Sequence, residues 1–460
     1  MSQPRFQSLA LSEGLVNNLT SLGYTTMTPV QAQSLPAILD GNDVIVQGET
    51  GSGKTAAFGL GLLSVIKPTQ FDAQALVLCP TRELADQVAT ELRRLARSIP
   101  NIKVLTLCGG KPVGPQITSL KKGVHIVVGT PGRIEDHLKR QSLQLNHVRA
   151  LVLDEADRML QMGFQDSIDA IVEQLPKQRQ TLLLSATYPS EIEGIAMSIM
   201  QQPQMVVAEA KVAEVAIEQY FYEVDTPEDR LHALCLLLMQ HQPESALVFC
   251  TTKQDVQQVA VQLRHKGFSV LALHGDLDQR ERDQNLLRFA NRSVNVLVAT
   301  DVAARGLDID KLDVVVNFHL ARDTEVHVHR IGRTGRAGES GLAWSFYHHT
   351  DKRRIEMFES MLDINICSES LPRGSVLEHQ PPRAAMVTLQ LEAGKKQKVR
   401  AGDILGALTG DGGVSGDQVG KINIFENRSY VAVQRQAVKR SLEKLKNGKL
   451  KGRNVRVRSL

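Results

Sequence analysis

Short apolar runs alternate with amphipathic stretches over most of this chain, and this pattern limits its fold more than any other feature. A first series of runs covers residues 44–46, 75–78, 126–128, 151–153 and 182–184. A second series covers residues 246–249, 270–273, 296–298 and 314–316. Strands that are apolar on both faces and separated by helices form parallel sheets with helices on both sides. The sequence therefore predicts an α/β fold with two similar parallel-sheet lobes in tandem.

The strand and helix rhythm lapses at two places, which we interpret as linkers. One is 208–216, and the other is 372–383, where Pro, Gly and His interrupt regular structure. A length of 460 residues also suggests roughly three domains. We therefore expect a first lobe at 1–207, a second lobe at 217–371 and a small domain at 384–460.

The small C-terminal domain has the predicted order βαββαβ. Its expected elements cover 385–391, 402–408, 420–425, 429–433, 437–445 and 454–457. This order is typical of the split βαβ modules that many RNA-binding proteins use, including the RNA-recognition motif (RRM). From Arg383 onward there are 17 Lys and Arg against six Asp and Glu, a net charge of +11, which leaves −7 on the rest of the chain. A basic end on an acidic body favours a polyanionic partner.

Composition indicates a globular chain without membrane spans. Hydrophobic residues make up 42% and charged residues 23%, and no segment reaches the ~20 apolar residues of a membrane span. The five scattered cysteines contain no C-x-x-C pair, so we expect reduced thiols and a cytoplasmic protein with no membrane partner. We expect Trp344 and the pair His348 and His349 to serve packing and not to bind a metal.

A phosphate-binding loop follows the first predicted strand. The eight residues fit the pattern G-x-x-x-x-G-K-[ST] and are Gly48, Glu49, Thr50, Gly51, Ser52, Gly53, Lys54 and Thr55. The glycines let backbone N–H groups surround phosphates, the lysine reaches the β and γ oxygens, and the threonine can bind Mg²⁺. We expect ATP and Mg²⁺ to bind here.

Acidic residues end the strand at 151–153, where a nucleotidase needs one carboxylate for the metal and one for water. We expect Asp154 to hold Mg²⁺ and Glu155 to orient and deprotonate the attacking water. Asp157 could serve partly as a helix cap.

The run Asp154-Glu155-Ala156-Asp157 resembles the motif that names the DEAD-box RNA helicases, and the other motifs of that family appear in order. The resemblance implies two RecA-like lobes and RNA-stimulated ATP hydrolysis. The segment from Gly23 to Gln31 resembles the adenine-reading Q motif. By this resemblance Gln31 binds the adenine edge, Tyr24 stacks on the base and Thr26 contacts it.

Further motifs imply coupling and catalytic roles by the same resemblance. Ser185 and Thr187 resemble the coupling motif whose hydroxyls bond to the Asp157 side of the acidic loop. In the second lobe, Arg333 and Arg336 resemble arginine fingers that stabilise the γ-phosphate in the transition state, and Asp308 would contact the ribose. Hydrolysis would then require closure of the lobes, so ATP and RNA should bind cooperatively.

Loops after several predicted strands resemble the RNA contacts of the family. They present backbone N–H groups, hydroxyls and arginines, which read phosphate and 2′-OH without reading bases. Each could alone be an ordinary loop or helix cap. The candidates are Pro80, Thr81, Arg82, Gly110, Thr130, Arg133, Gln279, Arg282, Thr300 and Gly306.

The C-terminal domain resembles the RNA-binding domain of the DbpA helicases, particularly at 402–410 and 419–424. That resemblance implies binding to a hairpin of 23S ribosomal RNA in the peptidyl-transferase region and a role in large-subunit assembly. Tyr430 is the one aromatic residue at the expected stacking positions, so we expect basic loops and edges to bind the RNA. The candidates are Lys421, Arg428, Arg435, Lys439, Arg440, Lys451 and Arg453.

Three alternatives stay open at this point. The chain could be an RNA helicase without ribosomal specificity, a DNA helicase or translocase of the same architecture, or a non-enzymatic ATP-gated RNA clamp or scaffold. No catalytic position is substituted, which favours an enzyme. We expect a monomer or at most a weak dimer that binds pre-50S particles.

Overall fold

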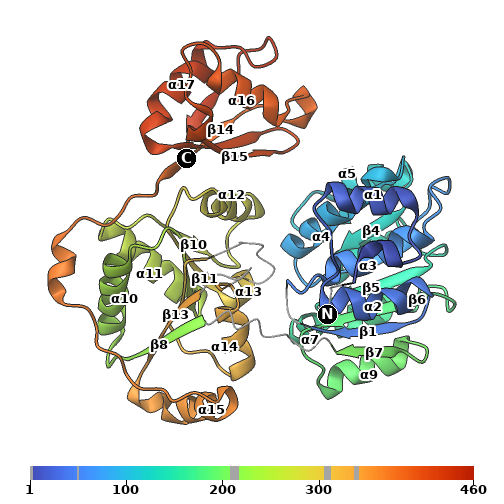
Figure 1. Ribbon diagram of the computed structural model, residues 1–460, viewed down its shortest axis with the longest axis horizontal. Helices are drawn as coiled ribbons and strands as arrows, with labels where there is room; N and C mark the ends of the chain where they lie inside the picture. The colour runs from blue at the N-terminus through green and yellow to red at the C-terminus, as the bar shows by residue number, and fades with distance from the viewer. Residues whose placement is uncertain (1–3, 49–50, 208–216, 305–311, 336–340) are drawn as a thin grey trace. The chain divides into compact units, whose positions relative to one another are not determined.

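The computed structural model describes residues 4–48, 51–207, 217–304, 312–335 and 341–460 (Figure 1). These residues form two parallel sheets and one antiparallel sheet, as the sequence predicts. The chain divides into two compact units, one with the first lobe and the other with the second lobe and the C-terminal domain. The predicted linker at 208–216 lies outside the described residues.

The sheet of the first lobe has seven parallel strands in the order β3-β4-β2-β5-β6-β1-β7. In chain order these are β1 (Val44–Gln47), β2 (Ala75–Leu78), β3 (Val104–Leu107), β4 (Ile126–Gly129), β5 (Ala150–Asp154), β6 (Gln180–Ser185) and β7 (Gln204–Val207). The five predicted strands are present. Sequence reasoning missed β3 and β7, which lie at the two edges and carry more polar or exposed residues than the central strands.

Alternate residues of the central strands enter two separate cores. Val44 and Val46 belong to one core, and Ile45 between them belongs to the other. This explains the apolar runs, because a strand covered on both faces has no solvent side. One face packs on α1 (Glu13–Ser21), α2 (Pro29–Leu39), α3 (Lys54–Val65) and α4 (Arg82–Leu95). The other packs on α5 (Val113–Lys121), α6 (Pro131–Lys139), α7 (Ala156–Gln161), α8 (Gln165–Val172) and α9 (Ser190–Ile199).

The second lobe repeats this design with six parallel strands in the order β10-β11-β9-β12-β13-β8. In chain order these are β8 (Ile217–Glu223), β9 (Ala246–Cys250), β10 (Val270–Leu273), β11 (Val296–Thr300), β12 (Val314–Asn317) and β13 (Gly341–Tyr347). Its helices are α10 (Pro227–His241), α11 (Lys253–His265), α12 (Gln279–Ala290), α13 (Asp301–Ala304), α14 (Thr324–Ile331) and α15 (Lys352–Leu362). Trp344 is fully buried in the core beneath α10 and α11, as expected for a packing residue.

The segment 372–383 is not free of structure, in contrast to the prediction. It contains the short 3-10 helix Gly374–Glu378, which lies beside α10. Val376 and Leu377 pack against the core of the second lobe. Apolar side chains inside a Pro- and Gly-rich stretch therefore attach this segment to the lobe.

The C-terminal domain has the predicted βαββαβ order and an antiparallel sheet β15-β16-β14-β17. Its elements are β14 (Met386–Leu391), α16 (Ala401–Thr409), β15 (Val419–Ile424), β16 (Ser429–Gln434), α17 (Val438–Asn447) and β17 (Val457–Ser459). The last strand begins three residues later than the predicted 454–457. Among the described residues, no helix has both the length and the apolar character needed to cross a bilayer.

Candidate nucleotide and RNA site

The phosphate-binding loop connects the end of β1 to the start of α3. The backbone is left-handed at Gly51 (φ 89°) and Gly53 (φ 95°), a conformation that glycine adopts without steric cost. Lys54 is the first residue of α3 and is 7% exposed, and its ammonium donates to the carbonyl oxygen of Gly48. Burial lowers the pKa of Lys54. Glu49 and Thr50 lie outside the described residues.

The segment before α2 is hydrogen-bonded to this loop. Thr28 caps α2, and its hydroxyl donates to the carbonyl oxygen of Ser52 at 2.8 Å. The Gln31 amide oxygen accepts from Thr28 N at 2.9 Å, and its Nε2 donates to the carbonyl oxygen of Gly53 at 3.1 Å. The oxygen and the nitrogen of the Gln31 amide thus both form hydrogen bonds inside the protein. From the sequence we expected this amide to bind the adenine edge.

The aromatic residue expected at the base lies beside these groups. The Tyr24 ring meets Phe6 edge to face with centroids 6.2 Å apart, and its hydroxyl donates to Glu91 Oε1 at 2.8 Å. Burial and this hydrogen bond raise the pKa of Tyr24 to about 12. Thr26 is exposed. The tyrosine is therefore held in one position by contacts on both its edge and its hydroxyl.

The acidic loop follows β5 and is almost entirely buried. Burial and the neighbouring Glu155 raise the pKa of Asp154 to about 7. Glu155 has a left-handed backbone (φ 55°), which turns the chain sharply from strand to helix. Its carboxylate pairs with the buried guanidinium of Arg158 at 3.1 Å. Arg158 holds the carboxylate that we expect to orient water.

The expected coupling contact is present for one of its two hydroxyls. Thr187 donates to Asp157 Oδ2 from its backbone N at 3.2 Å and from its hydroxyl at 3.1 Å. Ser185 does not make the expected contact. Its Oγ is buried, and no partner for it is found among the described residues. It lies at the end of β6 next to β1, where its carbonyl oxygen instead accepts from Gly48 N at 3.0 Å.

The strand order separates two groups of candidate residues along one edge of the first sheet. The phosphate-binding loop, the acidic loop and Ser185 follow β1, β5 and β6, which are neighbours. Thr81, Gly110 and Thr130 follow β2, β3 and β4, which are also neighbours. Carboxyl ends of parallel strands are the usual ligand-binding edge of such sheets. One half of this edge is therefore suited to a nucleotide and the other to a second ligand.

The candidate RNA residues of this lobe are held by local contacts. The Arg82 guanidinium lies against the backbone of Gly110, where a Cβ would approach its Nη1 to 2.1 Å. Arg133 donates to the carbonyl oxygen of Lys111 at 3.1 Å and to Gln116 Oε1 at 2.9 Å. Thr81 caps α4 by accepting from Leu84 N at 3.2 Å. Pro80 is buried beside it.

In the second lobe, Arg330 of the arginine-rich segment is held by several hydrogen bonds. It pairs with Asp301 and also donates to Asn317 Oδ1 at 3.0 Å and to the carbonyl oxygen of His319 at 2.8 Å. Arg333 is buried. Arg336, Asp308 and Gly306 lie outside the described residues.

The other candidates of the second lobe lie on α12 and at the end of β11. Arg282 donates to the carbonyl oxygen of Ala303 at 3.2 Å, which links α12 to α13. Thr300 caps α13 by accepting from Ala303 N at 3.3 Å. Gln279 Nε2 donates to Asp283 at 2.8 Å. These bonds bring the ends of neighbouring β10 and β11 into one cluster.

The basic candidates of the C-terminal domain are on its surface. Lys421, Arg435, Lys439, Arg440, Lys451 and Arg453 are exposed, and Arg428 is partly buried and pairs with Glu392 at 3.5 Å. Tyr430 is only 8% exposed and lies edge to face with Phe425 at 5.6 Å. Thr388 is buried and its hydroxyl bonds to Ser293 of the second lobe at 2.7 Å. Burial of the Tyr430 ring therefore disfavours base stacking on it.

Sequence reasoning missed three positioning residues. Thr28, Arg158 and Arg330 lie within or close beside the motif residues named from the sequence, but received no role. Arg158 could have been found, because an arginine one turn after Glu155 can reach it on the helix. Arg330 could not, because its partners come from distant segments of the chain.

Comparisons with known proteins agree with this geometry. A DEAD/DEAH box helicase family model matches residues 28–195, and a helicase conserved C-terminal domain model matches residues 229–338. A DbpA RNA binding domain model matches residues 388–459. The chain is 54% identical over 445 residues to the ATP-dependent RNA helicase DbpA of Escherichia coli, which covers 97% of both chains. The chain belongs to the DEAD-box ATP-dependent RNA helicases.

Two further relatives show which part of this DbpA-like helicase is widely shared. The DEAD-box ATP-dependent RNA helicase CshA of Bacillus subtilis is 44% identical over 354 residues, 77% of this chain and 72% of its own. A structure of S. cerevisiae Dbp5 bound to RNA and ADP BeF3 matches with a TM-score of 0.71 and 30% identity, over 79% of this chain and 95% of its own. The likeness to DbpA extends further along this chain than either of these matches.

Proposed function

We propose that this RNA helicase remodels 23S ribosomal RNA during assembly of the large ribosomal subunit. The observation that carries the proposal is the match of residues 388–459 to the DbpA RNA binding domain. The net charge of +11 from Arg383 onward and the exposed basic side chains support an RNA ligand there. The DbpA-like domain would deliver the two lobes to their target, and the lobes would act on whatever RNA lies nearby.

In the nucleotide site we propose that Lys54 binds the β- and γ-phosphates and that Glu155 deprotonates the attacking water. Gly48, Gly51, Ser52 and Gly53 would surround the phosphates, and the Lys54 ammonium would leave the Gly48 carbonyl for them. Tyr24, Thr26 and Gln31 would bind the base, which requires the Gln31 amide to exchange its bond to Gly53 for adenine. Glu49, Thr50 and Asp308 are assigned to the nucleotide on sequence alone.

The acidic loop fits a magnesium ion. Asp154 is a buried carboxylate whose pKa is raised by burial, so a cation beside it would stabilise its charged form. Together with the Thr55 hydroxyl it offers the oxygen ligands that Mg²⁺ prefers. When bound, Mg²⁺ would neutralise charge on the phosphate oxygens. Arg333 and Arg336 would supply further positive charge to the transition state.

In the RNA site we propose that the strand-end residues bind phosphate and 2′-OH groups without regard to sequence. In the first lobe these residues are Pro80, Thr81, Arg82, Gly110, Thr130 and Arg133. In the second lobe they are Gln279, Arg282, Thr300 and Gly306. Target choice would then rest on the C-terminal domain, through Lys421, Arg428, Arg435, Lys439, Arg440, Lys451 and Arg453.

The compartment and the oligomeric state of the enzyme are also part of the proposal. All five cysteines are free thiols, as in a reducing compartment, so we place the protein in the cytoplasm. We propose that it acts as a monomer or weak dimer on pre-50S particles.

Binding measurements test the proposed target. Fluorescence anisotropy would compare a 23S hairpin fragment from the peptidyl-transferase region with a scrambled RNA of the same length. We expect the hairpin to bind at least about tenfold more tightly than the scrambled RNA. This is well below the typical ratio of about 10³ or more between specific and nonspecific affinity. The double variant Lys439→Glu and Arg440→Glu should reduce this preference, since both side chains are exposed on α17. Equal affinity for both RNAs would leave an RNA helicase without ribosomal specificity.

The catalytic roles have their own test. Lys54→Ala should lose ATP binding, and Glu155→Gln should bind ATP and RNA together while hydrolysis falls by about 10²- to 10⁴-fold, the scale of general base catalysis. Wild-type turnover in Glu155→Gln would overturn the assignment of that residue. ATP-dependent RNA binding without any hydrolysis by the wild-type chain would instead favour the alternative of a non-enzymatic ATP-gated clamp.

A further inference from the structure

The second lobe repeats the strand order of the first, and this repeat marks a second ligand-binding edge. Without β7, the first sheet reads β3-β4-β2-β5-β6-β1, and the second reads β10-β11-β9-β12-β13-β8. The strands β8, β12 and β13 therefore correspond to β1, β5 and β6, whose carboxyl ends carry the phosphate-binding loop, the acidic loop and Ser185. Ligands of parallel sheets bind at such ends.

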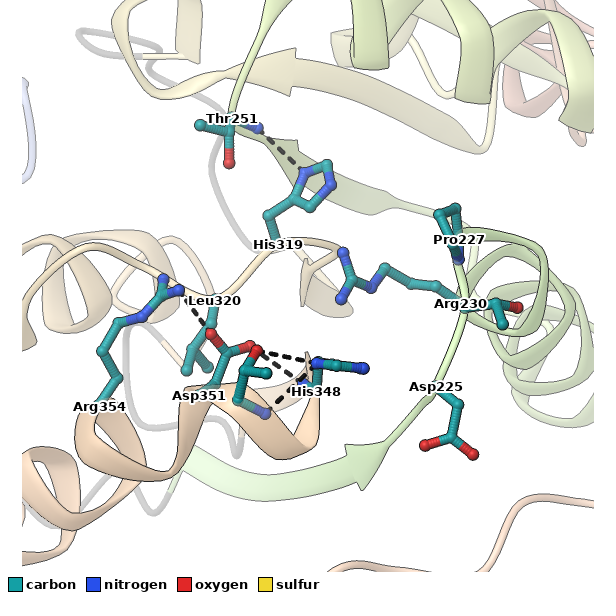
Figure 2. Close-up of a pocket in the computed structure, with 11 residues that line it drawn as sticks. Asp225, Pro227, Arg230, Thr251, His319, Leu320, His348, Asp351 and Arg354 are labelled. Atoms are coloured by element: carbon teal, nitrogen blue, oxygen red, sulfur yellow. Dashed lines mark hydrogen bonds and ion pairs between the residues drawn. The ribbon is translucent and has the colours of Figure 1, made fainter.

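A pocket of 380 Å³ lies at this corresponding edge of the second lobe (Figure 2). Asp225, Thr251, His319 and His348 line it, and they follow β8, β9, β12 and β13. The turn from β8 to α10 consists of Val224, Asp225 and Thr226 and contains no glycine, so it cannot surround phosphates as the loop of the first lobe does. A ligand other than a nucleotide is expected here.

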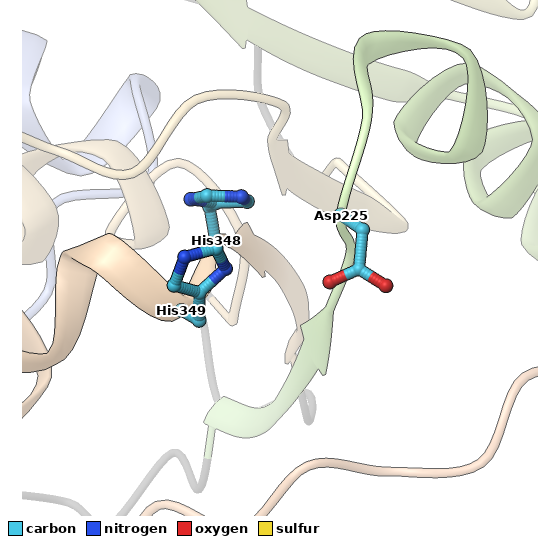
Figure 3. Close-up of side chains that lie close together, drawn as sticks. All are labelled: Asp225, His348 and His349. Atoms are coloured by element: carbon cyan, nitrogen blue, oxygen red, sulfur yellow. The ribbon is translucent and has the colours of Figure 1, made fainter.

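Three side chains with metal-binding atoms meet at the rim of this pocket (Figure 3). The ligand atoms of Asp225, His348 and His349 all lie within 4.8 Å of one another. Strand pairing brings them together, because β13 pairs with β8 in parallel up to Tyr347 and Glu223. Val224 N then donates to the carbonyl oxygen of Tyr347 at 2.9 Å, so the residues that follow both strands emerge side by side.

One of the imidazoles is held in place by the surrounding structure. His348 Nδ1 accepts from Thr350 N at 3.3 Å and lies 2.8 Å from the Thr350 hydroxyl, which leaves Nε2 for a metal ion. A metal ion on Nε2 places the ring proton on Nδ1, which would then donate it to the Thr350 hydroxyl, and metal-binding histidines nearly always make such a second bond. The His349 ring lies against the His348 ring with centroids 3.8 Å apart. Neither residue is buried, so this pair lies outside the hydrophobic core.

We propose that Asp225, His348 and His349 form a site for a divalent ion of the zinc class. Two imidazoles and one carboxylate favour Zn²⁺, Ni²⁺ or Cu²⁺ over Mg²⁺, which takes oxygen ligands. Ligand atoms around Zn²⁺ lie about 3.4 Å apart for bonds near 2.1 Å, so the exposed side chains of Asp225 and His349 must turn inward on binding. The nearby Asp351 carboxylate pairs with Arg354 at 2.5 Å and is not needed for the site.

Calorimetric titration of the full chain with Zn²⁺, without nucleotide or affinity tag, tests the site. The Cys367→Ser background removes the one exposed thiol among the described cysteines. Co²⁺, followed by its visible absorption, reports nitrogen ligation directly. We expect one ion per chain, and each of Asp225→Asn, His348→Ala and His349→Ala should weaken binding at least about tenfold. Mg²⁺ should not compete.

Two further variants separate this site from adventitious binding. His265→Ala removes an exposed histidine of α11 outside the cluster and should leave the affinity unchanged. Thr350→Val removes the hydroxyl that would accept the Nδ1 proton when a metal ion is bound, and should weaken binding by about 10- to 100-fold. Absence of saturable binding, or equal affinity in His348→Ala, His349→Ala and His265→Ala, would overturn the proposal. Fluorescence of the buried Trp344 would verify that each variant is folded.

Discussion

Arg330 of α14 binds Asp301, the first residue of α13, through two parallel hydrogen bonds of 2.6 and 2.8 Å. The guanidinium side chain is 4% exposed, and it also lies over the Phe249 ring at 5.1 Å. One side chain thus connects the start of α13, the end of β12 and the end of β9. The arginine-rich segment depends on this residue for its position, while Arg333 and Arg336 are the proposed catalytic residues.

We expect Arg330→Lys to destabilise the second lobe by about 3 kcal/mol, the scale for breaking a buried ion pair. A lysine cannot reproduce the planar, bidentate contact. Guanidinium unfolding followed by tryptophan fluorescence measures this lobe specifically, because Trp344 is the one tryptophan of the chain. The matched control is Arg322→Lys, whose ion pair with Asp323 is exposed and should contribute little. Equal losses in the two variants would contradict the positioning role.

Gln31→Ala should raise the KM for ATP by about tenfold and narrow the preference for ATP over GTP. The variant lacks the amide that we propose to turn from Gly53 to the adenine edge, and each hydrogen bond to the base would contribute about 1 kcal/mol. Steady-state hydrolysis with each nucleotide at saturating RNA measures both effects. Gln33→Ala on the exposed face of α2 is the control and should behave as wild type. Unchanged nucleotide preference in Gln31→Ala would exclude Gln31 from base recognition.

Thr187→Val should separate ATP hydrolysis from unwinding. The variant keeps the backbone hydrogen bond to Asp157 and loses the hydroxyl bond of 3.1 Å. A hydrogen bond to a charged group contributes about 1.5 kcal/mol or more, which corresponds to about a tenfold fall in unwinding. Parallel ATPase and duplex-unwinding assays give the ratio of the two activities. A ratio equal to that of Ser190→Ala, an exposed hydroxyl at the start of α9, would refute the coupling role.

The second lobe should lose stability as the pH falls below about 6.5. Burial and the nearby Arg330 lower the pKa of His327 to about 4. Between pH 6.5 and 4 the unfolded chain binds more protons at this residue than the folded one, so its contribution to stability is complete above pH 6.5 and declines below it. The loss from this residue at pH 5 is about 2 kcal/mol.

Replacement of His327 shows how much of the pH-dependent loss of stability comes from this side chain. His327→Gln keeps a hydrogen-bonding side chain for Gln219, whose Oε1 lies 2.8 Å from His327 Nε2. The variant should reduce the difference in unfolding free energy between pH 7.5 and pH 5 by about 2 kcal/mol. His319, whose pKa is also lowered to about 4 by burial, accounts for part of the remaining slope. An unchanged difference in His327→Gln would contradict the neutral, buried state of this ring.

The sequence predicted most of the architecture because burial on both faces leaves a direct signal. All the strands predicted from apolar runs are present, and the βαββαβ domain was recognised from its element order. Edge strands carry a weaker signal, which explains why β3 and β7 were missed. The structured segment at 374–378 was missed because its two apolar residues have no periodic pattern.

The candidate site was predictable where its residues are close in sequence. The phosphate-binding loop and the acidic loop are such cases, since each is a local turn after a strand. Contacts between distant segments were not predictable, such as the bonds from Gln31 to Gly53 and from Arg330 to Asp301. The cluster of Asp225, His348 and His349 likewise depends on strand pairing, because its members are far apart in sequence.

Steady-state ATP hydrolysis by the full chain tests the central claim most directly. It would be measured without nucleic acid, with single-stranded DNA, with generic RNA, and with a 23S fragment that carries the peptidyl-transferase hairpin. The account predicts strong stimulation by the fragment, weaker stimulation by generic RNA, and loss of the difference when residues from Arg383 onward are deleted. Stimulation by DNA alone, or none by any RNA, would contradict it.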